Sequence, residues 1–241
     1  MSMFAGYRAV IVGGSAGIGR ATALMLEGRG AQVFVIDRND AAPFACARAD
    51  LADASAVEAA MESAARALGG IDILVNSAGI DLETPSEAGN DDDWSHLLSV
   101  NLSGPMRTAR AAFPYLAASG HGAIVNVSSG AGLKPIPDRA AYCASKAGLV
   151  MLSKSLALDW AEEGIRVNTV CPGAVHSDLF DQSWANAPDP QAKLSEIRDR
   201  YALRRIAQPE ELAEAIVFLA GPAACHITGS TLAVDGGRTF Y

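Results

Sequence analysis

The sequence has few of the residues that mark secreted, metal-binding or nucleic-acid-binding proteins. Only four cysteines occur among 241 residues, widely spaced and without a CxxC pair, so neither a disulfide framework nor a zinc site is indicated. We expect all four to be buried thiols. The net charge is −8 and no basic stripe interrupts it, which disfavours nucleic acid and anionic membranes. The expected partner is a small molecule, with no nucleic acid, membrane or metal ion.

Long apolar runs are also missing. Residues Met1–Tyr7 contain no stretch of signal-peptide length, and no later segment approaches about 18 uninterrupted apolar residues. The sequence therefore predicts a cytoplasmic protein. Half of the residues are hydrophobic and only 19% are charged, which is typical of a globular protein whose sheet is covered on both faces.

Short apolar runs alternate with Ala-rich helical stretches along the whole chain. This alternation predicts an α/β fold, with a doubly wound (Rossmann) parallel sheet of about seven strands and helices on both faces. No repeat or linker divides the chain, so residues 1–241 are predicted to form one domain. The predicted strands are Ala9–Val12, Gln32–Ile36, Phe44–Arg48, Ile71–Val75, Ala123–Val127, Arg166–Val170 and Thr231–Val234. The predicted helices are Ile18–Arg29, Ala54–Leu68, Trp94–Leu116, Ala140–Glu162 and Pro209–Ala220.

The longest stretch without a predicted strand runs from Pro172 to Gln208 and holds a charged helical piece around Lys193–Arg204. Long insertions in compact domains are usually functional or mobile. We interpret residues 173–208 as a lid on the substrate side of the domain. A passive surface excursion is the alternative.

Three glycines follow the first predicted strand, at Gly13, Gly17 and Gly19. Without side chains they allow a tight turn and a close approach of the backbone to a pyrophosphate, and the free N–H groups at the start of the next helix bind anions. The strand-to-helix context makes this glycine pattern a strong indication of a dinucleotide site. Ser15 and Ile18 belong to the same turn and are predicted to contact the cofactor.

Asp37 ends the second predicted strand, about 20 residues beyond the glycines, where an acid can accept hydrogen bonds from the adenosine ribose hydroxyls. Its charge repels the 2′-phosphate of NADP, so NAD is the predicted cofactor. Arg38 keeps NADP open as an alternative, because a guanidinium at this place can stack on adenine or bind that phosphate.

Tyr142 and Lys146 lie four residues apart in a predicted helix, so their side chains share one face. A nearby ammonium lowers the phenol pKa from its usual value of about 10 by favouring the phenolate. By spacing alone, a packed tyrosine and a solvated lysine fit equally well. Ser129 adds weight, because it ends a predicted strand where doubly wound sheets present reactive groups and can polarise a substrate carbonyl.

Taken together, these motifs resemble the short-chain dehydrogenase/reductase family from Arg8 to Gly237. The resemblance implies a catalytic tetrad of Ser129, Tyr142, Lys146 and Asn101, the last holding a water that links the lysine to solvent. It also implies three further groups of cofactor contacts. These are the adenine pair Asp50 and Leu51, the motif residues Asn76, Ala78 and Gly79, and the nicotinamide segment with Pro172, Gly173, Val175 and Ser177.

The resemblance further implies hydride transfer between NAD(H) and a secondary alcohol or ketone. In this reaction Ser129 and Tyr142 hold the alcohol, and the proton leaves through Tyr142, the ribose and Lys146. Relatives pair through the two long helices corresponding to Trp94–Leu116 and Ala140–Glu162, so a homodimer or homotetramer is expected.

The substrate class is suggested by two further features. The link from Asp37 to about Phe44 is too short for the helix that most relatives carry there, and this trimming resembles the cytosolic 3-hydroxybutyrate and sugar-acid dehydrogenase-like branch. Arg139, three residues before Tyr142, can bind a substrate carboxylate with both guanidinium nitrogens. A hydroxy acid or sugar acid is therefore expected, although an ion-pair role for Arg139 fits equally well.

Two other functions are compatible with parts of the pattern. One is an NADP-dependent ketone reductase, for example on 3-oxoacyl thioesters, if Arg38 binds the 2′-phosphate. The other is a sensor or scaffold that binds NAD without turnover. The intact tetrad opposes the second alternative.

Overall fold

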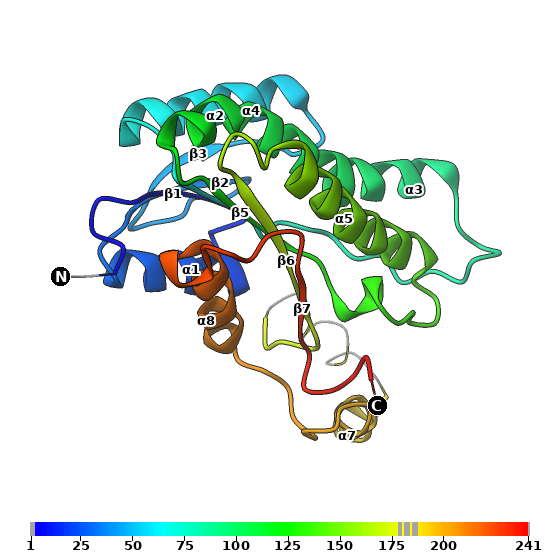
Figure 1. Ribbon diagram of the computed structural model, residues 1–241. Coiled ribbons are helices and arrows are strands. Elements are labelled where there is room, and N and C mark those ends of the chain that lie inside the picture. Colours follow the sequence, from blue (N-terminus) through cyan, green and yellow to red (C-terminus); the bar gives the residue numbers. More distant parts are fainter. Residues whose placement is uncertain (1–2, 178–179, 181–183, 185–187, 241) are drawn as a thin grey trace.

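A seven-stranded parallel sheet forms the centre of the computed structural model, which describes residues 3–177, 180, 184 and 188–240. The strand order is β3-β2-β1-β4-β5-β6-β7 (Figure 1). This single-domain, doubly wound arrangement confirms the predicted fold class. The strands are β1 (Arg8–Val12), β2 (Gln32–Asp37), β3 (Ala45–Arg48), β4 (Ile73–Asn76), β5 (Ala123–Val127), β6 (Arg166–Pro172) and β7 (Thr231–Val234).

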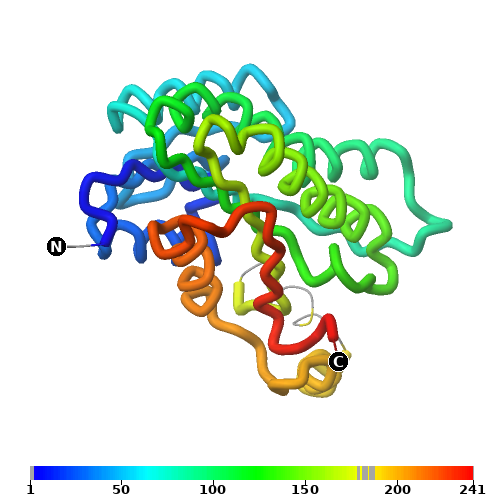
Figure 2. The backbone as a smooth tube through the Cα atoms, viewed as in Figure 1, coloured from blue at the N-terminus to red at the C-terminus, as the bar shows by residue number. Residues whose placement is uncertain are grey.

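Helices cover both faces of the sheet. α1 and α8 lie side by side on one face, and α2, α4 and α5 lie on the other (Figures 1 and 2). None of the described helices is both long and apolar enough to cross a membrane. The helices are α1 (Gly17–Gly28), α2 (Ala54–Leu68), α3 (Asp91–Leu98), α4 (Gly104–Ser119), α5 (Ala140–Asp159), α7 (Pro190–Asp199) and α8 (Pro209–Ala220), with a π-helical turn at Ser99–Ser103 and 3₁₀ turns at Gly130–Gly132 and Pro222–Ala224.

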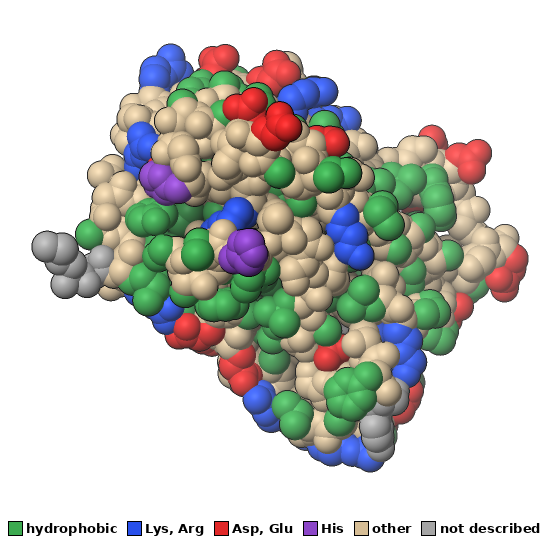
Figure 3. Space-filling model, viewed as in Figure 1, with side chains coloured by type: hydrophobic (Ala, Val, Ile, Leu, Met, Phe, Trp, Pro, Cys, Tyr) green, Lys and Arg blue, Asp and Glu red, His purple; other side chains and the backbone are tan. Residues whose placement is uncertain are grey.

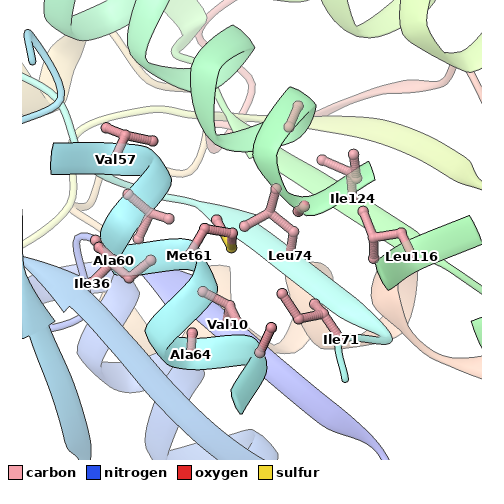
Figure 4. Packing of buried hydrophobic residues seen from close by; sticks show 14 of the residues in the cluster. Val10, Ile36, Val57, Ala60, Met61, Ala64, Ile71, Leu74, Leu116 and Ile124 are labelled. Carbon is pink, nitrogen blue, oxygen red and sulfur yellow. The ribbon is translucent and has the colours of Figure 1, made fainter. Parts of the chain in front are cut away.

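Two hydrophobic clusters hold the layers together, one on each side of the sheet. Successive strand residues point to opposite faces, so Val10 joins one cluster and Ile11 joins the other. In the first cluster Met61 of α2 packs near Leu74 of β4 (Figure 4). In the second, Leu26 of α1 is fully buried. A sheet covered on both faces gives its carboxyl edge a rigid base.

The region predicted as one helix, Trp94–Leu116, is divided in the structure, so that prediction is wrong in detail. α3 begins at Asp91 because the Asn90 side chain caps it, with Oδ1 accepting from the Asp93 N–H at 2.9 Å. The π-helical turn then separates α3 from α4. A π-turn fits one more residue than an α-turn and commonly marks a functional site.

The segment 173–208 contains α7 in its described part. Leu194 and Ile197 of α7 pack in a small cluster with Tyr201. The Tyr201 hydroxyl accepts a hydrogen bond from the Ala174 N–H at 2.9 Å, which ties the segment to the end of β6. Residues 178–179, 181–183 and 185–187 of the predicted lid lie outside the described residues, and the lid role stays a prediction.

The expectation of four buried thiols is wrong. Cys171 is buried in β6, but Cys143 is half-buried and both Cys46 and Cys225 are exposed. Cys46 lies on β3, an edge strand whose side chains are mostly exposed. Helices cover the central strands much more fully than this edge.

Candidate active site

A cavity of about 370 Å³ opens at the carboxyl ends of β4, β5 and β6, where doubly wound sheets place their reactive groups. Three residues of the predicted tetrad line it, namely Ser129, Tyr142 and Lys146. Further predicted contacts that line it are Ile18, Gly79, Arg139, Pro172, Gly173, Val175 and Ser177. Among the charged residues of the wall, the sequence reasoning did not single out Asp81, Glu83, Asp138, Arg200 and Arg238.

Tyr142 is half-buried in the cavity wall, and its hydroxyl is hydrogen-bonded to Ser129. Ser129 follows β5 in an extended conformation, and its Oγ also accepts from the Ala131 N–H at 3.0 Å. Burial raises the pKa of Tyr142 to about 12, the bond to Ser129 opposes this rise, and the charge of Asp81 adds to it. The phenol is therefore neutral at neutral pH.

Lys146 is buried, with its Nζ 5.7 Å from the centre of the Tyr142 ring. The ammonium donates to the Val127 carbonyl at 3.2 Å, and burial lowers its pKa to about 8. The net shift of the Tyr142 pKa is upward and not downward as expected, because the effect of burial is larger than that of any neighbouring group. The two side chains are nevertheless held together on one face of α5.

Asn101 lies fully buried in the π-helical turn, near Lys146 and the hydroxyl of Ser145. Its side chain holds both backbone groups of Ile80, accepting from the N–H at 2.9 Å and donating to the carbonyl at 2.8 Å. A side chain at Gly79 would meet Asn101 Oδ1 at 3.2 Å and Lys146 Nζ at 3.3 Å. The predicted tetrad is therefore brought together in space, with Gly79 leaving room between two of its members.

The glycine turn has the shape that a pyrophosphate requires. Gly13 has φ +81°, and a Cβ there would lie 2.5 Å from the Ala78 nitrogen. A Cβ at Gly19 would lie 2.0 Å from the Gly13 carbonyl oxygen. α1 begins at Gly17 with no acidic residue in its first turn, and Ala16 offers no side-chain cap. The first N–H groups of the helix are thus open to an anionic group.

The predicted adenosine contacts lie along the ends of β2 and β3. The Asp37 carboxylate accepts from the Ser15 N–H at 3.1 Å and from the Asn39 N–H at 3.0 Å, which places it beside the glycine turn. Arg38 is exposed. Asp50 accepts from the Ala52 N–H at 2.9 Å, whereas the Leu51 side chain is buried.

Asn76 has a structural role in this molecule. Its Nδ2 donates to Asn126 Oδ1 at 2.8 Å, and its Oδ1 accepts from the Thr108 hydroxyl at 2.7 Å. The two asparagines are register partners on β4 and β5. The Asn76 side chain therefore joins two strands and α4 and does not point to the cofactor turn. Ala78 is the motif residue that approaches this turn, whereas Gly79 lines the cavity beside Lys146.

Arg139 is an ion-pair residue, the second of the two roles that its position allows. Its guanidinium contacts Asp81 and Glu83, each at 2.5 Å. Asp81 follows β4, which ends at Asn76, and is 58 residues away along the chain. The signal that sequence reasoning missed was this pair of acids directly after the Asn-Ser-Ala-Gly motif, at the carboxyl end of a strand. Among the described residues, no three His, Cys, Asp or Glu side chains gather to hold a metal ion.

Comparison with known proteins agrees with this geometry. A family model described as enoyl-(acyl carrier protein) reductase matches residues 12–239. A D-threitol dehydrogenase of Mycolicibacterium smegmatis is 38% identical over 247 residues, covering 96% of this chain and 92% of the relative. The chain belongs to the short-chain dehydrogenase/reductase family. It is accordingly an oxidoreductase that acts on CH–OH groups, as predicted.

Two further members of this family show the range of relatives. A cis-4-hydroxycyclohexanecarboxylate dehydrogenase of Sinomonas cyclohexanicum is 38% identical, covering 98% of each chain. A gluconate 5-dehydrogenase from Burkholderia cenocepacia, solved in complex with NADP and tartrate, superposes with a TM-score of 0.90 at 36% identity and covers 99% of this chain and 97% of its own. Dehydrogenases of this family use nicotinamide cofactors.

Proposed function

We propose that this protein is an NAD-dependent dehydrogenase that oxidises a secondary alcohol on a small polar molecule such as a polyol, hydroxy acid or sugar acid. The observation that carries the proposal is the presence of Ser129, Tyr142 and Lys146 around one cavity. The names of the relatives, a threitol and a gluconate dehydrogenase among them, support this substrate range.

Each group of residues in the site would have a distinct role in the reaction. Gly13, Gly17 and Gly19 would hold the pyrophosphate, and the bound nicotinamide supplies the hydride acceptor. Ser129 holds the alcohol oxygen beside the Tyr142 hydroxyl, which receives the proton. Because the pKa of Tyr142 is about 12, the phenolate needs a cation nearby, and the Lys146 ammonium is within reach.

A substrate screen tests this proposal. Polyols, hydroxy acids and sugar acids are offered with NAD, and NADH formation is read by absorbance. Replacing Tyr142 by Phe should lower kcat at least about 100-fold because the proton acceptor is lost, while NADH binding stays near normal. Near-normal turnover by this variant would overturn the proposed mechanism. A blank screen despite tight NADH binding would instead favour an NAD-binding sensor.

The choice of NAD rests on Asp37. Its carboxylate stands beside the glycine turn, where a 2′-phosphate would meet a negative charge. Fluorescence titration should give tighter binding of NADH than of NADPH, and Asp37→Ser should reduce the difference about 10-fold or more. Tighter NADPH binding by the unaltered protein would favour the NADP-dependent ketone reductase. The exposed Arg38 and the NADP-bound relative support this alternative.

A homo-oligomer is also part of the proposal. Met151 and Leu158 on α5 are 60% and 80% exposed, and such apolar side chains suit an interface between copies. Light scattering on the purified protein should give a dimer or tetramer mass. The cytoplasmic location stays a prediction.

A further inference from the structure

One oxygen of a carboxylate in the cavity wall has no partner within the described protein. Asp81 Oδ2 contacts Arg139, and the Leu82 N–H lies close enough to the carboxylate to lower its pKa, but Asp81 Oδ1 is shielded from the surface and accepts no hydrogen bond of normal geometry from any described residue. Buried carboxylate oxygens are costly to leave unpaired. Asp81 also lines the catalytic cavity. An acceptor of this kind is available to a donor group on a bound molecule.

The position of Asp81 is fixed from several sides. Asn101 holds both backbone groups of the preceding residue, Ile80. The Thr84 N–H donates to the Asp138 carbonyl at 2.7 Å, so the chain after Asp81 lies against the segment that leads into α5. Arg139 then joins Asp81 to Glu83. Groups held in this way are preorganised for recognition.

Asp81 is also near the reacting groups. It shares the cavity with Ser129 and Tyr142, and its charge affects the pKa of both Tyr142 and Lys146. Arg139, by contrast, already contacts two carboxylates, so its own positive charge is neutralised before any ligand arrives. This wall of the cavity therefore offers a hydrogen-bond acceptor to a substrate and not an unpaired cation.

We propose that Asp81 Oδ1 accepts a hydrogen bond from a second substrate hydroxyl, on the carbon next to the one that is oxidised, and that Arg139 is the positioning residue that holds Asp81. The inference rests on the proposed dehydrogenase function and narrows its substrates to those with adjacent hydroxyl groups, such as polyols and sugar derivatives. A substrate carboxylate, if present, is bound elsewhere than at Arg139.

The test compares two alcohols that differ in one hydroxyl, cyclohexane-1,2-diol and cyclohexanol, each oxidised with NAD. The unaltered protein should prefer the diol in kcat/KM, because an acceptor oxygen shielded from solvent discriminates against a substrate that cannot donate to it. With both proteins compared at the plateau of their pH profiles, Asp81→Ala should lower kcat/KM for the diol about 10- to 100-fold and leave cyclohexanol within a few-fold. Glu214→Ala is the matched control, since it removes an exposed carboxylate that pairs with Arg29 at 2.5 Å outside the cavity.

Three outcomes would overturn the inference, and they are distinguishable. If the unaltered protein oxidises both alcohols equally well, the dehydrogenase function stands and only the role of Asp81 fails. If Asp81→Ala loses both activities alike while still binding NADH, its role is structural. If the unaltered protein oxidises neither alcohol and no other compound in the screen, the proposed function fails and the inference fails with it.

Arg139 provides a second, independent measurement. Because Arg139 positions Asp81, Arg139→Ala should raise KM for the diol more than it lowers kcat. Arg139→Lys should restore part of the loss by keeping one contact to Asp81. If Arg139→Ala instead impairs hydroxy acids selectively and spares diols, Arg139 binds a substrate carboxylate directly and the positioning role is wrong.

Discussion

At the scale of single residues, the chemistry of the site depends on how Tyr142 is kept neutral. Burial raises its pKa, the hydrogen bond with Ser129 lowers it, and the charge of Asp81 raises it again. In alcohol oxidation Tyr142 has to accept a proton as the phenolate. The groups that raise its pKa disfavour the phenolate, so a positive charge near Tyr142 is needed to stabilise it. Asp81 is therefore expected to influence both substrate choice and the pH dependence of catalysis.

The pH dependence can be predicted with its sign. Asp81→Asn removes a negative charge that raises the pKa of Tyr142, so the phenolate forms at lower pH. The profile of kcat/KM for cyclohexanol should shift toward lower pH, by up to about one unit. Cyclohexanol has no second hydroxyl, so the lost hydrogen bond does not distort the comparison. An unchanged profile, or a shift to higher pH, would show that Asp81 does not act on Tyr142.

Lys146 gives a prediction about stability. Its pKa of about 8 in the folded chain lies below the ordinary 10.5, so the unfolded chain binds the additional proton between these values. The free energy of unfolding therefore rises with pH across this window, as the cost of burying the charge disappears. Lys146→Met should stabilise the protein at neutral pH, by up to about 3 kcal/mol, and by little above pH 10.5.

Urea unfolding of both proteins at the two pH values measures this difference, and the variant should be catalytically impaired throughout. A Lys146→Met protein that is less stable than the parent at neutral pH would mean that the bond to Val127 outweighs the cost of burial.

At the scale of elements, the turn between β1 and α1 tolerates no side chain at Gly19. A Cβ there would lie 2.0 Å from a backbone oxygen, so the turn has to move. Gly19→Ala should weaken NADH binding at least about 10-fold, since the free N–H groups lose their alignment. Gly28→Ala, in the same helix with nothing within 4 Å of the added Cβ, should leave binding unchanged. Equal NADH affinity of the two variants would contradict this account.

Sequence patterns predicted most elements because each strand and helix carries a local signal. The apolar alternation placed the strands, and the Pro209–Ala220 helix was predicted with the bounds that α8 has. The segment 94–116 failed because a π-turn has no pattern of its own and is set by the contacts of Asn101 with Ile80. The first turn of α3 was also missed, although Asn90 followed by three acids is a helix-start signal.

The site was predictable only in part for a similar reason. Tyr142, Lys146 and Ser129 stand at ends of elements that the pattern located, so their meeting followed from the fold class. The pairing of Arg139 with Asp81 joins residues 58 positions apart, and no local pattern encodes it. The exposure of Cys46 likewise depends on β3 lying at the edge of the sheet, a fact of topology.

At the scale of the whole molecule, substitutions in the hydrophobic core are expected to lower stability without changing catalysis. Leu74 of β4 is fully buried in the cluster formed with α2 and α4, away from the catalytic cavity. Leu74→Ala should cost about 2–5 kcal/mol of unfolding free energy and lower Tm by several degrees, with KM near normal at low temperature. Leu24→Ala, at a position 45% exposed, is the matched control. A changed KM in the first variant would show that the core and the cavity are coupled.

One face of the molecule carries charges of both signs. On the face shown in Figure 3, Lys and Arg side chains are interspersed with Asp and Glu, with hydrophobic side chains between them. This face has no basic stripe of the kind that tracks a nucleic-acid backbone.

The π-helical turn at Ser99–Ser103 has a consequence for changes in the length of the chain. Its additional residue sets the angle at which Asn101 meets Ile80, and through Ile80 it fixes the wall that carries Asp81. Deleting one residue there would restore a regular helix but rotate Asn101 by about 100° away from its partner. A change in the length of this turn is therefore expected to move Asn101 and the wall that carries Asp81 together.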